Sequence, residues 1–455
     1  MIVMKFGGTS VESQEAVARV TGIVQKYRER RPIVVVSAMG RTTNKLLQAA
    51  SEAAAGRRDQ ALALVDELRG HHLAHGLPLA GSAAAELDRY IRTHFEWLDE
   101  LVKGLSVVGE LSPRSMDAIA SVGERLSSLI VSFAFRSAGM PVQHVDSRRV
   151  ILTDDRFTQA APLFHESFEL LRQVVRPAAE SSVVVMGGFI GSTKDGHTTT
   201  LGRGGSDYSA AIVGAGVDAE EIQIWTDVDG MLTVDPGIVP NGHRVKSISF
   251  AEAAEMAYFG AKVLHPATVL PAVEKNIPVL ILNSKRPDVD GTRITSESMP
   301  CRNPVKSISC KSKITILNIR STRMLMAHGF LRRIFEVFDR YATSVDMVST
   351  SEVSVSLTID NQENLPAICN EVRQFAEISV ENEQAIVCLV GENIRHTPGI
   401  AGRAFQVLRN KNIRMISQGA SLLNLGFVIA ETDLRDAVTA LHKEFFSELD
   451  PAVFD

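Results

Sequence analysis

Residues 198–211, TTTLGRGGSDYSAA, decide the fold of this chain. Three threonines lead into Arg203, a glycine pair, and then Ser206 and Asp207 at the start of an apolar helix. Glycines let the backbone turn or approach a ligand where a side chain would clash. Ser206 or Asp207 can cap the helix, whose N-terminal N–H groups attract anions, and Arg203 can grip a carboxylate or a phosphate. The stretch predicts an anion site, with a solvated arginine on an ordinary turn as the alternative.

The start of the chain reads as strand, glycine-rich loop, helix and strand. Residues 2–6 form a short strand that breaks at Gly7-Gly8, and residues 14–30 have apolar positions at helical spacing. Residues 33–39, IVVVSAM, are a near-continuous apolar run typical of a parallel strand covered on both faces. The loop is neither a Walker A loop nor a GxGxxG fingerprint. This opening indicates an α/β sandwich.

The alternation of strands and helices continues and favours a mainly parallel sheet. Residues 46–108 read as helical, interrupted at 70–81 by a histidine-containing stretch to which we give little weight as a metal site. Ser112-Pro113 begins a further helix with a cap and a proline in its first turn. Further strands are expected at 140–146, 183–191, 222–230 and 277–284, a helix at 250–276 that breaks at Pro266, and a helix C-cap at 214–219.

Serine and proline cluster at residues 294–304 and indicate a domain boundary there. Beyond it, a strand-helix-strand-strand-helix-strand pattern occurs twice, and the second copy lacks its last strand. We expect residues 305–310 to supply that strand, so that the repeats interlock. The predicted domains are 1–296 and 304–455, with repeats at about 314–384 and about 385–455.

Composition excludes several functional classes. The 455-residue chain has 45% hydrophobic and 22% charged residues, which is ordinary for a globular protein. A net charge of −5 argues against nucleic acid as a partner. We see no signal peptide and expect no membrane span, because the apolar runs are strand-sized. The four cysteines are widely spaced without a CxxC motif, which predicts a reduced, cytoplasmic protein without structural zinc.

Five motifs in order resemble the aspartate kinases of the amino-acid kinase family: KFGGTS (5–10), SVGERLS (121–127), TTTLGRGGSDYSA (198–210), TDVDG (226–230) and GAKVLHPAT (260–268). The C-terminal repeat resembles their paired ACT domains, so the resemblance spans essentially the whole chain. It implies a three-layer α/β kinase domain with a mainly parallel sheet, followed by two ferredoxin-like ACT domains. The implied activity is ATP-dependent phosphorylation of the L-aspartate β-carboxylate to 4-phospho-L-aspartate, the first step of the aspartate-derived amino-acid pathway. Because the chain ends after the repeat, no fused homoserine dehydrogenase is expected.

The resemblance also implies which residues handle the phosphates. Lys5 matches the lysine at the transferred phosphate, Lys262 the second phosphate lysine, and Asp207 the aspartate that holds these lysines in place. From the residues alone, Lys5 could equally be a solvated strand-end lysine. The implied nucleotide-binding positions are Lys5, Gly7, Gly8, Thr9, Thr226, Asp227, Leu232 and Lys262. Mg²⁺ would be held through the ATP phosphates and water, with no protein ligands.

For the acceptor, Arg203 is similar to the residue that grips the substrate carboxylate, and Glu124 to the one that takes its ammonium. One fixed cation and one fixed anion suit an amino-acid zwitterion, although a helix-surface glutamate is the alternative for Glu124. The remaining implied substrate contacts are Thr43, Gly204, Gly205 and Ser206, with Ser37 a weaker candidate. Where the family often has an aromatic residue and an arginine near adenosine, this chain has Leu232 and Gly237.

The repeat implies regulation and assembly. ACT domains leave sheet edges that pairing can cover, so we expect a homodimer or a dimer of dimers through them. The segments 324–331 and 345–352 resemble those of lysine-inhibited aspartate kinases, which implies lysine as the effector; threonine and S-adenosylmethionine stay open. Met326 and Ala327 depart from the His and Ser of some bacterial lysine-sensitive forms. The implied regulatory residues are Met324, Gly329, Phe330, Leu331, Val345, Asp346, Ser351 and Glu352.

Two rival functions remain at this point. A sister kinase could use glutamate, N-acetylglutamate or carbamate, but the Arg203 and Glu124 pair and the ACT repeat weigh against it. An amino-acid-binding regulator with a dead kinase site is the other, and the intact lysines and Asp207 argue against it. A turnover assay separates them.

Overall fold

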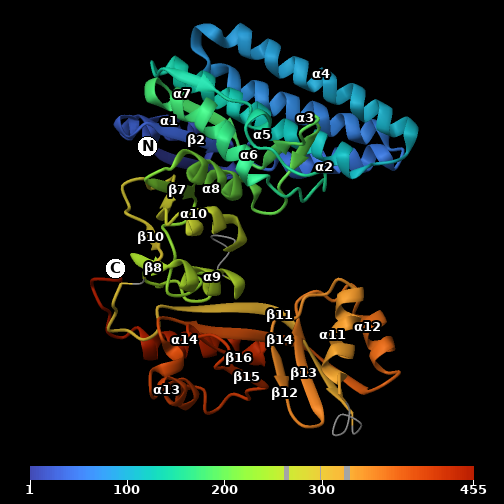
Figure 1. Ribbon diagram of the computed structural model, residues 1–455, viewed down its shortest axis with the longest axis vertical. Helices are drawn as coiled ribbons and strands as arrows, with labels where there is room; N and C mark the ends of the chain where they lie inside the picture. The colour runs from blue at the N-terminus through green and yellow to red at the C-terminus, as the bar shows by residue number, and fades with distance from the viewer. Residues whose placement is uncertain (261–265, 298, 322–327) are drawn as a thin grey trace. The chain divides into compact units, whose positions relative to one another are not determined.

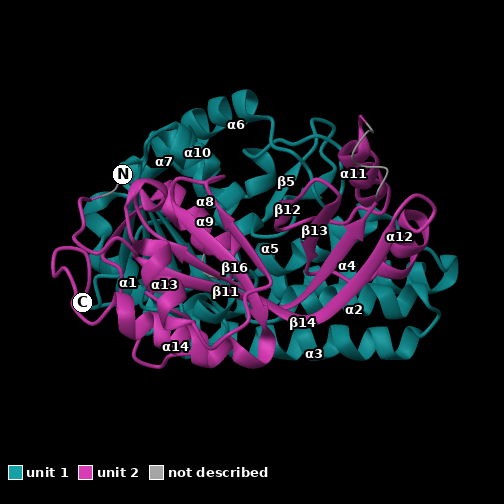
Figure 2. Cartoon of the chain, turned by 90° about the horizontal axis from the view of Figure 1, so that it is seen from below, with its two compact units in different colours: residues 1–231, 264–297 teal, residues 232–263, 298–455 magenta. Residues whose placement is uncertain are grey.

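A computed structural model describes residues 1–260, 266–297, 299–321 and 328–455. It divides into two compact units (Figures 1 and 2). The first unit is Met1–Met231 with Leu264–Glu297, and the second is Leu232–Val263 with Ser298–Asp455. The segment Leu232–Val263, which we predicted inside the first domain, thus packs with the second unit. The units group segments by packing, so the domain limits 1–296 and 304–455 stay predictions.

The first unit is built on a mainly parallel sheet. Its strands lie in the order β3 (Val142–His144), β4 (Val183–Gly187), β2 (Pro32–Val36), β1 (Ile2–Phe6), β7 (Glu221–Thr226), β9 (Val279–Asn283) and β10 (Thr292–Thr295). Only β10 runs antiparallel to its neighbour within this set. A separate antiparallel ribbon joins β5 (Ile190–Ser192) to β6 (Thr198–Thr200).

Helices cover both faces of this sheet. They are α1 (Gln14–Lys26), α2 (Thr42–Ala54), α3 (Arg58–Gly76), α4 (Ala84–Val108), α5 (Pro113–Ser137), α6 (Phe164–Leu170), α7 (Arg176–Ser181), α8 (Gly205–Val217) and α10 (Leu270–Glu274). Alternate residues of β1 such as Ile2, Met4 and Phe6 join one core cluster with α1 to α5. Because side chains alternate along a strand, Val3 and Lys5 face the other way, toward α8.

Two helices in the first unit differ from the sequence prediction. Helix α3 continues through the histidines to Gly76, so no break occurs at residue 70. His72 lies in the core, where burial lowers its pKa to about 4, so it is a core residue and no surface histidine. Helix α8 runs through Gly214 and Gly216 and ends at Val217, and Asp218 is its C-cap in a left-handed conformation. The stretch 214–219, predicted as a C-cap, therefore contains the last turn of the helix and the cap.

Among the described helices, α5 is long and apolar enough to cross a membrane by length and composition. This corrects the expectation that no such run exists. Of its most apolar window, 83% is buried inside the structure, as in a core helix, so the finding is weak evidence for a membrane span. Its start is as predicted: the Ser112 hydroxyl accepts a hydrogen bond from the Ser115 N–H, and Pro113 opens the first turn.

The second unit contains an antiparallel sheet. The strands lie in the order β12 (Val348–Thr350), β13 (Ser354–Ile359), β11 (Ser307–Arg320), β14 (Glu377–Val390), β16 (Asn424–Ala430) and β15 (Met415–Gln418). The helices are α9 (Phe250–Tyr258), α11 (Phe330–Arg340), α12 (Leu365–Val372), α13 (Ile400–Val407) and α14 (Leu434–Phe445), and β8 (Ser247–Ser249) precedes α9. Figure 1 shows α11 and α12 at one end of this sheet and α13 and α14 at the other.

Two long strands belong to both repeats. Residues 307–311 of β11 pair with 386–390 of β14, which in turn pair with β16, whereas residues 316–320 pair with 377–381 and with β13. The first part of β11 therefore lies in the sheet of the second repeat, next to β14. Each repeat has the strand-helix-strand-strand-helix pattern on an antiparallel sheet. Together with the parallel sheet of the first unit, this confirms the predicted fold class.

A buried ion pair joins α9 to β11 inside the second unit. The Lys306 ammonium lies 3.1 Å from Oε1 of Glu252, and both side chains are fully buried. Glu252 also closes a capping box with Ser249 at the start of α9. A buried charge that loses its partner is strongly destabilising, because water cannot replace the lost interaction.

We predict that Lys306→Met destabilises the second unit by about 3–5 kcal/mol, the usual cost of removing one partner from a buried ion pair. The double variant Lys306→Met/Glu252→Gln, which also removes the negative charge but keeps a capping side chain, should recover most of the loss. Urea unfolding followed by circular dichroism measures both. Equal instability of the single and double variants would contradict this interpretation.

Candidate active site

A cleft of about 450 Å³ opens at the carboxyl ends of β1, β2 and β4 in the first unit. Ligands of parallel α/β sheets bind at this edge, where the loops converge. The predicted residues that line the cleft are Lys5, Gly8, Ser37, Thr43, Glu124, Arg203, Gly204, Gly205, Ser206 and Asp207. Residues that are more than 200 positions apart in the sequence thus meet around one cavity.

The predicted pair of Lys5 and Asp207 is formed. Lys5 lies at the end of β1 on the face toward α8, and its ammonium is 2.7 Å from Oδ1 of Asp207 in the first turn of α8. Lys5 is only 9% exposed. Alternation along β1 and the start of α8 after the glycine pair place the two side chains together. The ion pair fixes a cation at the floor of the cleft.

The turn before α8 differs in detail from the prediction. Neither Ser206 nor Asp207 caps the helix: its N-cap is Gly204, in a left-handed conformation with φ 72°. The Gly204 carbonyl accepts hydrogen bonds from the N–H groups of Asp207 and Tyr208. Because glycine adopts this conformation without strain, the helix starts early and Ser206 and Asp207 are left to face the cleft.

The loop after β1 lies directly against the loop after β2. A side chain at Gly8 would come within 2.9 Å of the Gly40 carbonyl oxygen and 3.0 Å of that of Ala38. The Gly40 N–H donates to the Gly8 carbonyl at 3.0 Å. Glycine is therefore required at position 8 by close backbone approach.

Glu124 is a buried carboxylate on α5, 3% exposed, that lines the cleft. Its Oε2 has no hydrogen-bond partner among the described residues. Burial raises its pKa from an ordinary 4.5 to about 8, although backbone N–H bonds from Ala38 and from its own residue act in the opposite direction. Burial therefore favours the protonated form of Glu124, whereas a bound cation would favour its ionised form.

Arg203 is exposed at the rim of the same cleft and makes no ion pair with any residue that the structure describes. Sequence reasoning missed Arg41, Asn44 and Phe189, which also line the cavity. Arg41 and Asn44 stand next to Thr43 in the segment that follows the buried strand β2. Their place after a strand end could have identified them as cleft residues. Phe189 follows Gly188 after β4, but nothing in its residue type marks it.

The predicted nucleotide residues lie mostly beside the cleft, at the ends of β1 and β7. The Gly7 N–H donates to the Trp225 carbonyl, which places Gly7 next to Thr226 at the end of the neighbouring strand. Thr9 and Asp227 are exposed. None of Gly7, Thr9, Thr226 and Asp227 lines the cavity, Leu232 lies in the second unit, and Lys262 lies outside the described residues.

The predicted regulatory residues lie in the second unit, except Met324, which is outside the described residues. Gly329 is the N-cap of α11 with φ 82°, followed by Phe330 and the 40% exposed Leu331. Val345 is half-buried, Glu352 is exposed, and the Ser351 hydroxyl bonds that of Ser354.

Asp346 is already engaged. Its Oδ1 is 2.8 Å from the Lys311 ammonium and 3.5 Å from the Tyr258 hydroxyl on α9. Its Oδ2 has no partner among the described residues, and burial raises its pKa. Lys311 also pairs with Asp360 at 2.7 Å. The free oxygen of Asp346 leaves room for one more donor.

The described residues contain no group of three or more histidine, cysteine, aspartate or glutamate side chains that could hold a metal ion.

Comparison with known proteins identifies two families. A model described as the amino acid kinase family matches residues 1–283, and one described as an ACT domain matches residues 387–445. Aspartokinase 1, chloroplastic, of Arabidopsis thaliana is 38% identical over 98% of this chain and 80% of that protein. Lysine-sensitive aspartokinase 3 of Escherichia coli is 37% identical over 98% of this chain and 99% of that protein.

Solved structures of an aspartokinase are also similar to this chain. The crystal structure of E. coli aspartokinase III in complex with aspartate and ADP is similar with a TM-score of 0.85 and 36% identity, covering 98% of this chain and 100% of that chain. The structure of the same enzyme in complex with lysine and aspartate gives a TM-score of 0.84.

We predict that protonation of Glu124 makes stability depend on pH. The folded group keeps its proton to about pH 8, whereas the unfolded one loses it near its ordinary value. Stability should therefore fall as pH rises between these values, by about 1 kcal/mol per pH unit. Urea unfolding of wild type and Glu124→Gln at pH 6 and pH 8 tests this. The variant should gain relative to wild type at the higher pH, and parallel pH profiles would exclude a raised pKa.

Proposed function

Since the chain belongs to the aspartokinases of the amino acid kinase family, we propose that its cleft binds aspartate between Glu124 and Arg203 and the terminal phosphate of ATP at Lys5. The observation that carries this proposal is the charge pattern of the cavity. Lys5 is a cation fixed by an ion pair, the buried carboxyl group of Glu124 has one oxygen without a partner among the described residues, and the exposed Arg203 makes no ion pair there.

The acceptor end suits an α-amino acid. Arg203 offers a planar fork for the α-carboxylate, and Oε2 of Glu124 can accept a hydrogen bond from the α-ammonium. Thr43 and Ser206 stand in the same cavity as hydroxyl donors, and Gly204 and Gly205 leave the backbone accessible. Binding of the ammonium favours ionised Glu124, so substrate binding releases a proton at neutral pH.

The nucleotide, which donates the phosphate, is proposed to bind at the carboxyl ends of β1 and β7. Lys5 lies where the two halves of the site meet, and Asp207 holds its ammonium against the floor. The N–H groups after β1 and the polar residues Thr226 and Asp227 after β7 are proposed to contact the nucleotide. Leu232 and Lys262 complete the proposed set on resemblance alone.

The chemistry needs positioning and charge neutralisation. A β-carboxylate oxygen of aspartate attacks the γ-phosphorus, a P–O bond forms, and the bond from that phosphorus to the β–γ bridging oxygen breaks. The products are 4-phospho-L-aspartate and ADP, and no protein nucleophile takes part. Lys5 stabilises charge on the transferred group. Mg²⁺, held through the ATP phosphates and water, would neutralise phosphate charge.

Regulation is proposed to act through the ACT repeats. A relative is named lysine-sensitive, and a similar structure contains lysine. We take lysine as the effector, with its amine at the unpartnered Oδ2 of Asp346. Effector binding inhibits by its differential affinity for two states of the enzyme. Assembly through the ACT repeats into a homodimer or a dimer of dimers belongs to this proposal.

The cellular setting is also proposed. The reaction would be the first step of the aspartate-derived pathway that supplies lysine, threonine and methionine. The four cysteines are free, which suits a reducing cytoplasm.

A turnover assay tests the function directly. With ATP and Mg²⁺, hydroxylamine traps an acyl phosphate as its hydroxamate, and aspartate should be the preferred acceptor over glutamate, N-acetylglutamate and carbamate. No turnover on any of them would favour a regulator with a dead kinase site. Preference for another acceptor would favour a sister kinase.

Arg203→Ala should reduce kcat/KM for aspartate by an amount equivalent to about 2–5 kcal/mol, because the substrate carboxylate would lose its charged partner. Arg19→Ala, an exposed arginine on α1, is the matched control and should behave as wild type. The KM for ATP should change little. A near-normal kcat/KM for aspartate in Arg203→Ala would remove Arg203 from the substrate site.

Lys5→Ala should lower kcat by about 10²–10³-fold, the usual loss for one preorganised transition-state donor. Since Asp207 would lose its partner, the fold must be verified by circular dichroism. Comparison with Lys5→Ala/Asp207→Asn, which restores charge balance, separates chemistry from stability. Recovery of activity in the double variant would show that Lys5 only neutralises Asp207.

Lys311→Met should strengthen inhibition by lysine, because the effector amine would no longer compete with the Lys311 ammonium for Asp346. Asp346→Ala should weaken it. Inhibition curves with lysine, threonine and S-adenosylmethionine, singly and in pairs, measure both effects. If lysine inhibits both variants as it does wild type, the effector does not bind at Asp346.

A further inference from the structure

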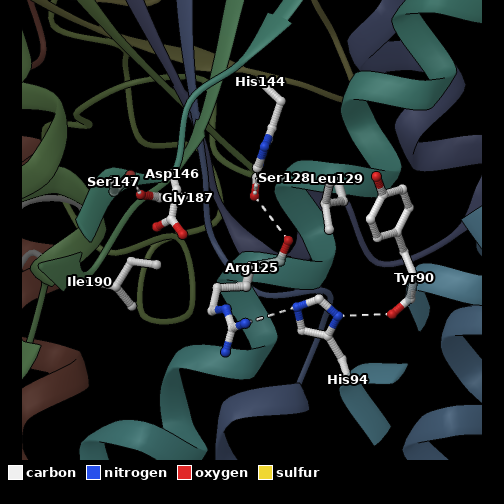
Figure 3. A pocket seen from close by; sticks show the side chains of 10 residues that line it. All are labelled: Tyr90, His94, Arg125, Ser128, Leu129, His144, Asp146, Ser147, Gly187 and Ile190. Carbon is white, nitrogen blue, oxygen red and sulfur yellow. Dashed lines mark hydrogen bonds between the residues drawn. The ribbon is translucent and has the colours of Figure 1, made fainter. Parts of the chain in front are cut away.

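A second cavity, of about 240 Å³, lies in the first unit beside the cleft (Figure 3). Its walls come from α4, α5, β3, β4, β5 and the 3₁₀ turn Ser147–Arg149. Adjacent residues line the two cavities: Glu124 and Phe189 line the cleft, whereas Arg125 and Ile190 line this one. Nothing in the proposed kinase reaction uses this second cavity.

Arg125 places a cation at one wall. Its Nη2 lies 3.0 Å from Nε2 of His94, and Nδ1 of His94 lies 2.8 Å from the Tyr90 carbonyl oxygen. A carbonyl only accepts, so Nδ1 of His94 carries the proton and Nε2 accepts from Arg125. His94 is therefore neutral in this arrangement, so this hydrogen bond does not neutralise the guanidinium charge.

The nearest carboxylate is already occupied. Asp146 binds Arg148 through both its oxygens, including Arg148 Nε at 3.0 Å from Oδ1 and Arg148 Nη2 at 2.5 Å from Oδ2. Arg125 forms no ion pair with any residue that the structure describes. A guanidinium has five N–H donors, and His94 takes one. Burial and the charge of Arg148 lower the pKa of Arg125 to about 10, although the charge of Asp146 acts in the opposite direction.

The rest of the cavity lining consists of a hydrogen-bonded pair, Ser128 and His144, and of apolar side chains. The Ser128 hydroxyl donates to the Arg125 carbonyl, so its oxygen can accept from Nε2 of His144 at 3.0 Å. Tyr90, Leu129 and Ile190 supply the apolar surface. Figure 3 shows the Arg125 side chain beside that of His94, with His144 and Asp146 on other walls.

We propose that this cavity is a binding site for the carboxylate of a small organic acid with a short apolar body, anchored by Arg125. The planar fork of the guanidinium matches a carboxylate in a bidentate arrangement. A single uncompensated cation suits a monoanion, and the apolar wall suits a short hydrocarbon chain better than the multiply charged phosphate ion. The ligand can be a plain acid or an amino acid, because both present the same group.

The test uses the full-length enzyme and isobutyrate as probe, at constant ionic strength and pH. Isothermal titration and thermal unfolding should show saturable binding to wild type, at least tenfold weaker in Arg125→Met. Arg136→Met, an exposed arginine on the same helix, should bind as wild type. The same titration is repeated with leucine in place of isobutyrate. Tighter binding of isobutyrate would identify the ligand as a plain acid, and tighter binding of leucine would identify it as an amino acid. Unchanged binding in Arg125→Met, or phosphate binding at least as tightly as isobutyrate, would overturn the proposal.

Two further variants keep the test independent of folding and of the kinase proposal. Arg203→Ala should retain isobutyrate binding. If Arg203→Ala loses isobutyrate binding and Arg125→Met retains it, isobutyrate binds in the kinase cleft instead. Leu129→Trp should block binding while Arg125 stays. Because Arg125 is an uncompensated cation, Arg125→Met without ligand should melt no lower than wild type. A lower melting temperature together with undisturbed binding in Leu129→Trp would assign Arg125 a structural role only.

Discussion

The ion pair between Lys5 and Asp207 is the constraint on which the first unit's site depends. It spans from the end of β1 to the first turn of α8, and both side chains are largely buried. An ion pair in this position is stable only if the strand end and the helix start are held in register, which the left-handed Gly204 and the close approach at Gly8 make possible. With Lys5 fixed, the loops after β1, β2 and β4 converge on one cleft.

Around that fixed pair, the first unit carries charges without partners. Glu124 has an unpaired carboxylate oxygen, and Arg203 and Arg125 have no carboxylate partner among the described residues. Of these groups only Glu124 is buried, and a buried polar group without a partner lowers the stability of the fold until a ligand satisfies it. Two of the three face the proposed kinase cleft, and the third faces the cavity beside it.

The second unit uses charge differently. There three side chains of α9 make polar contacts: Glu252 with Lys306, Glu255 with Ser421 and Asn424, and Tyr258 with Asp346. One of these reaches the carboxylate that we assign to the effector amine. Tyr258, which makes this contact, is the last residue of α9 and stands four positions before Lys262 in the sequence.

The sequence by itself determined the fold class and most of the cleft. The strand IVMKF followed by Gly7-Gly8 placed Lys5 beside a loop at a strand end, glycines at 204 and 205 marked the turn, and the repeated strand and helix order predicted the paired C-terminal sheet. The motif resemblance named Glu124 and Arg203. Local patterns suffice here because periodicity and turn chemistry are properties of neighbouring residues.

Only the tertiary structure decided the rest. It showed that Gly204 caps α8 in place of a side chain, that His72 belongs to the core, and that Arg41, Asn44 and Phe189 share the cleft. It also showed that Asp346 is already paired with Lys311, and that Arg125 is left without a carboxylate partner among the described residues. Whether a charge is paired, and how far burial moves its pKa, depends on groups distant in the chain, and no local pattern contains that information.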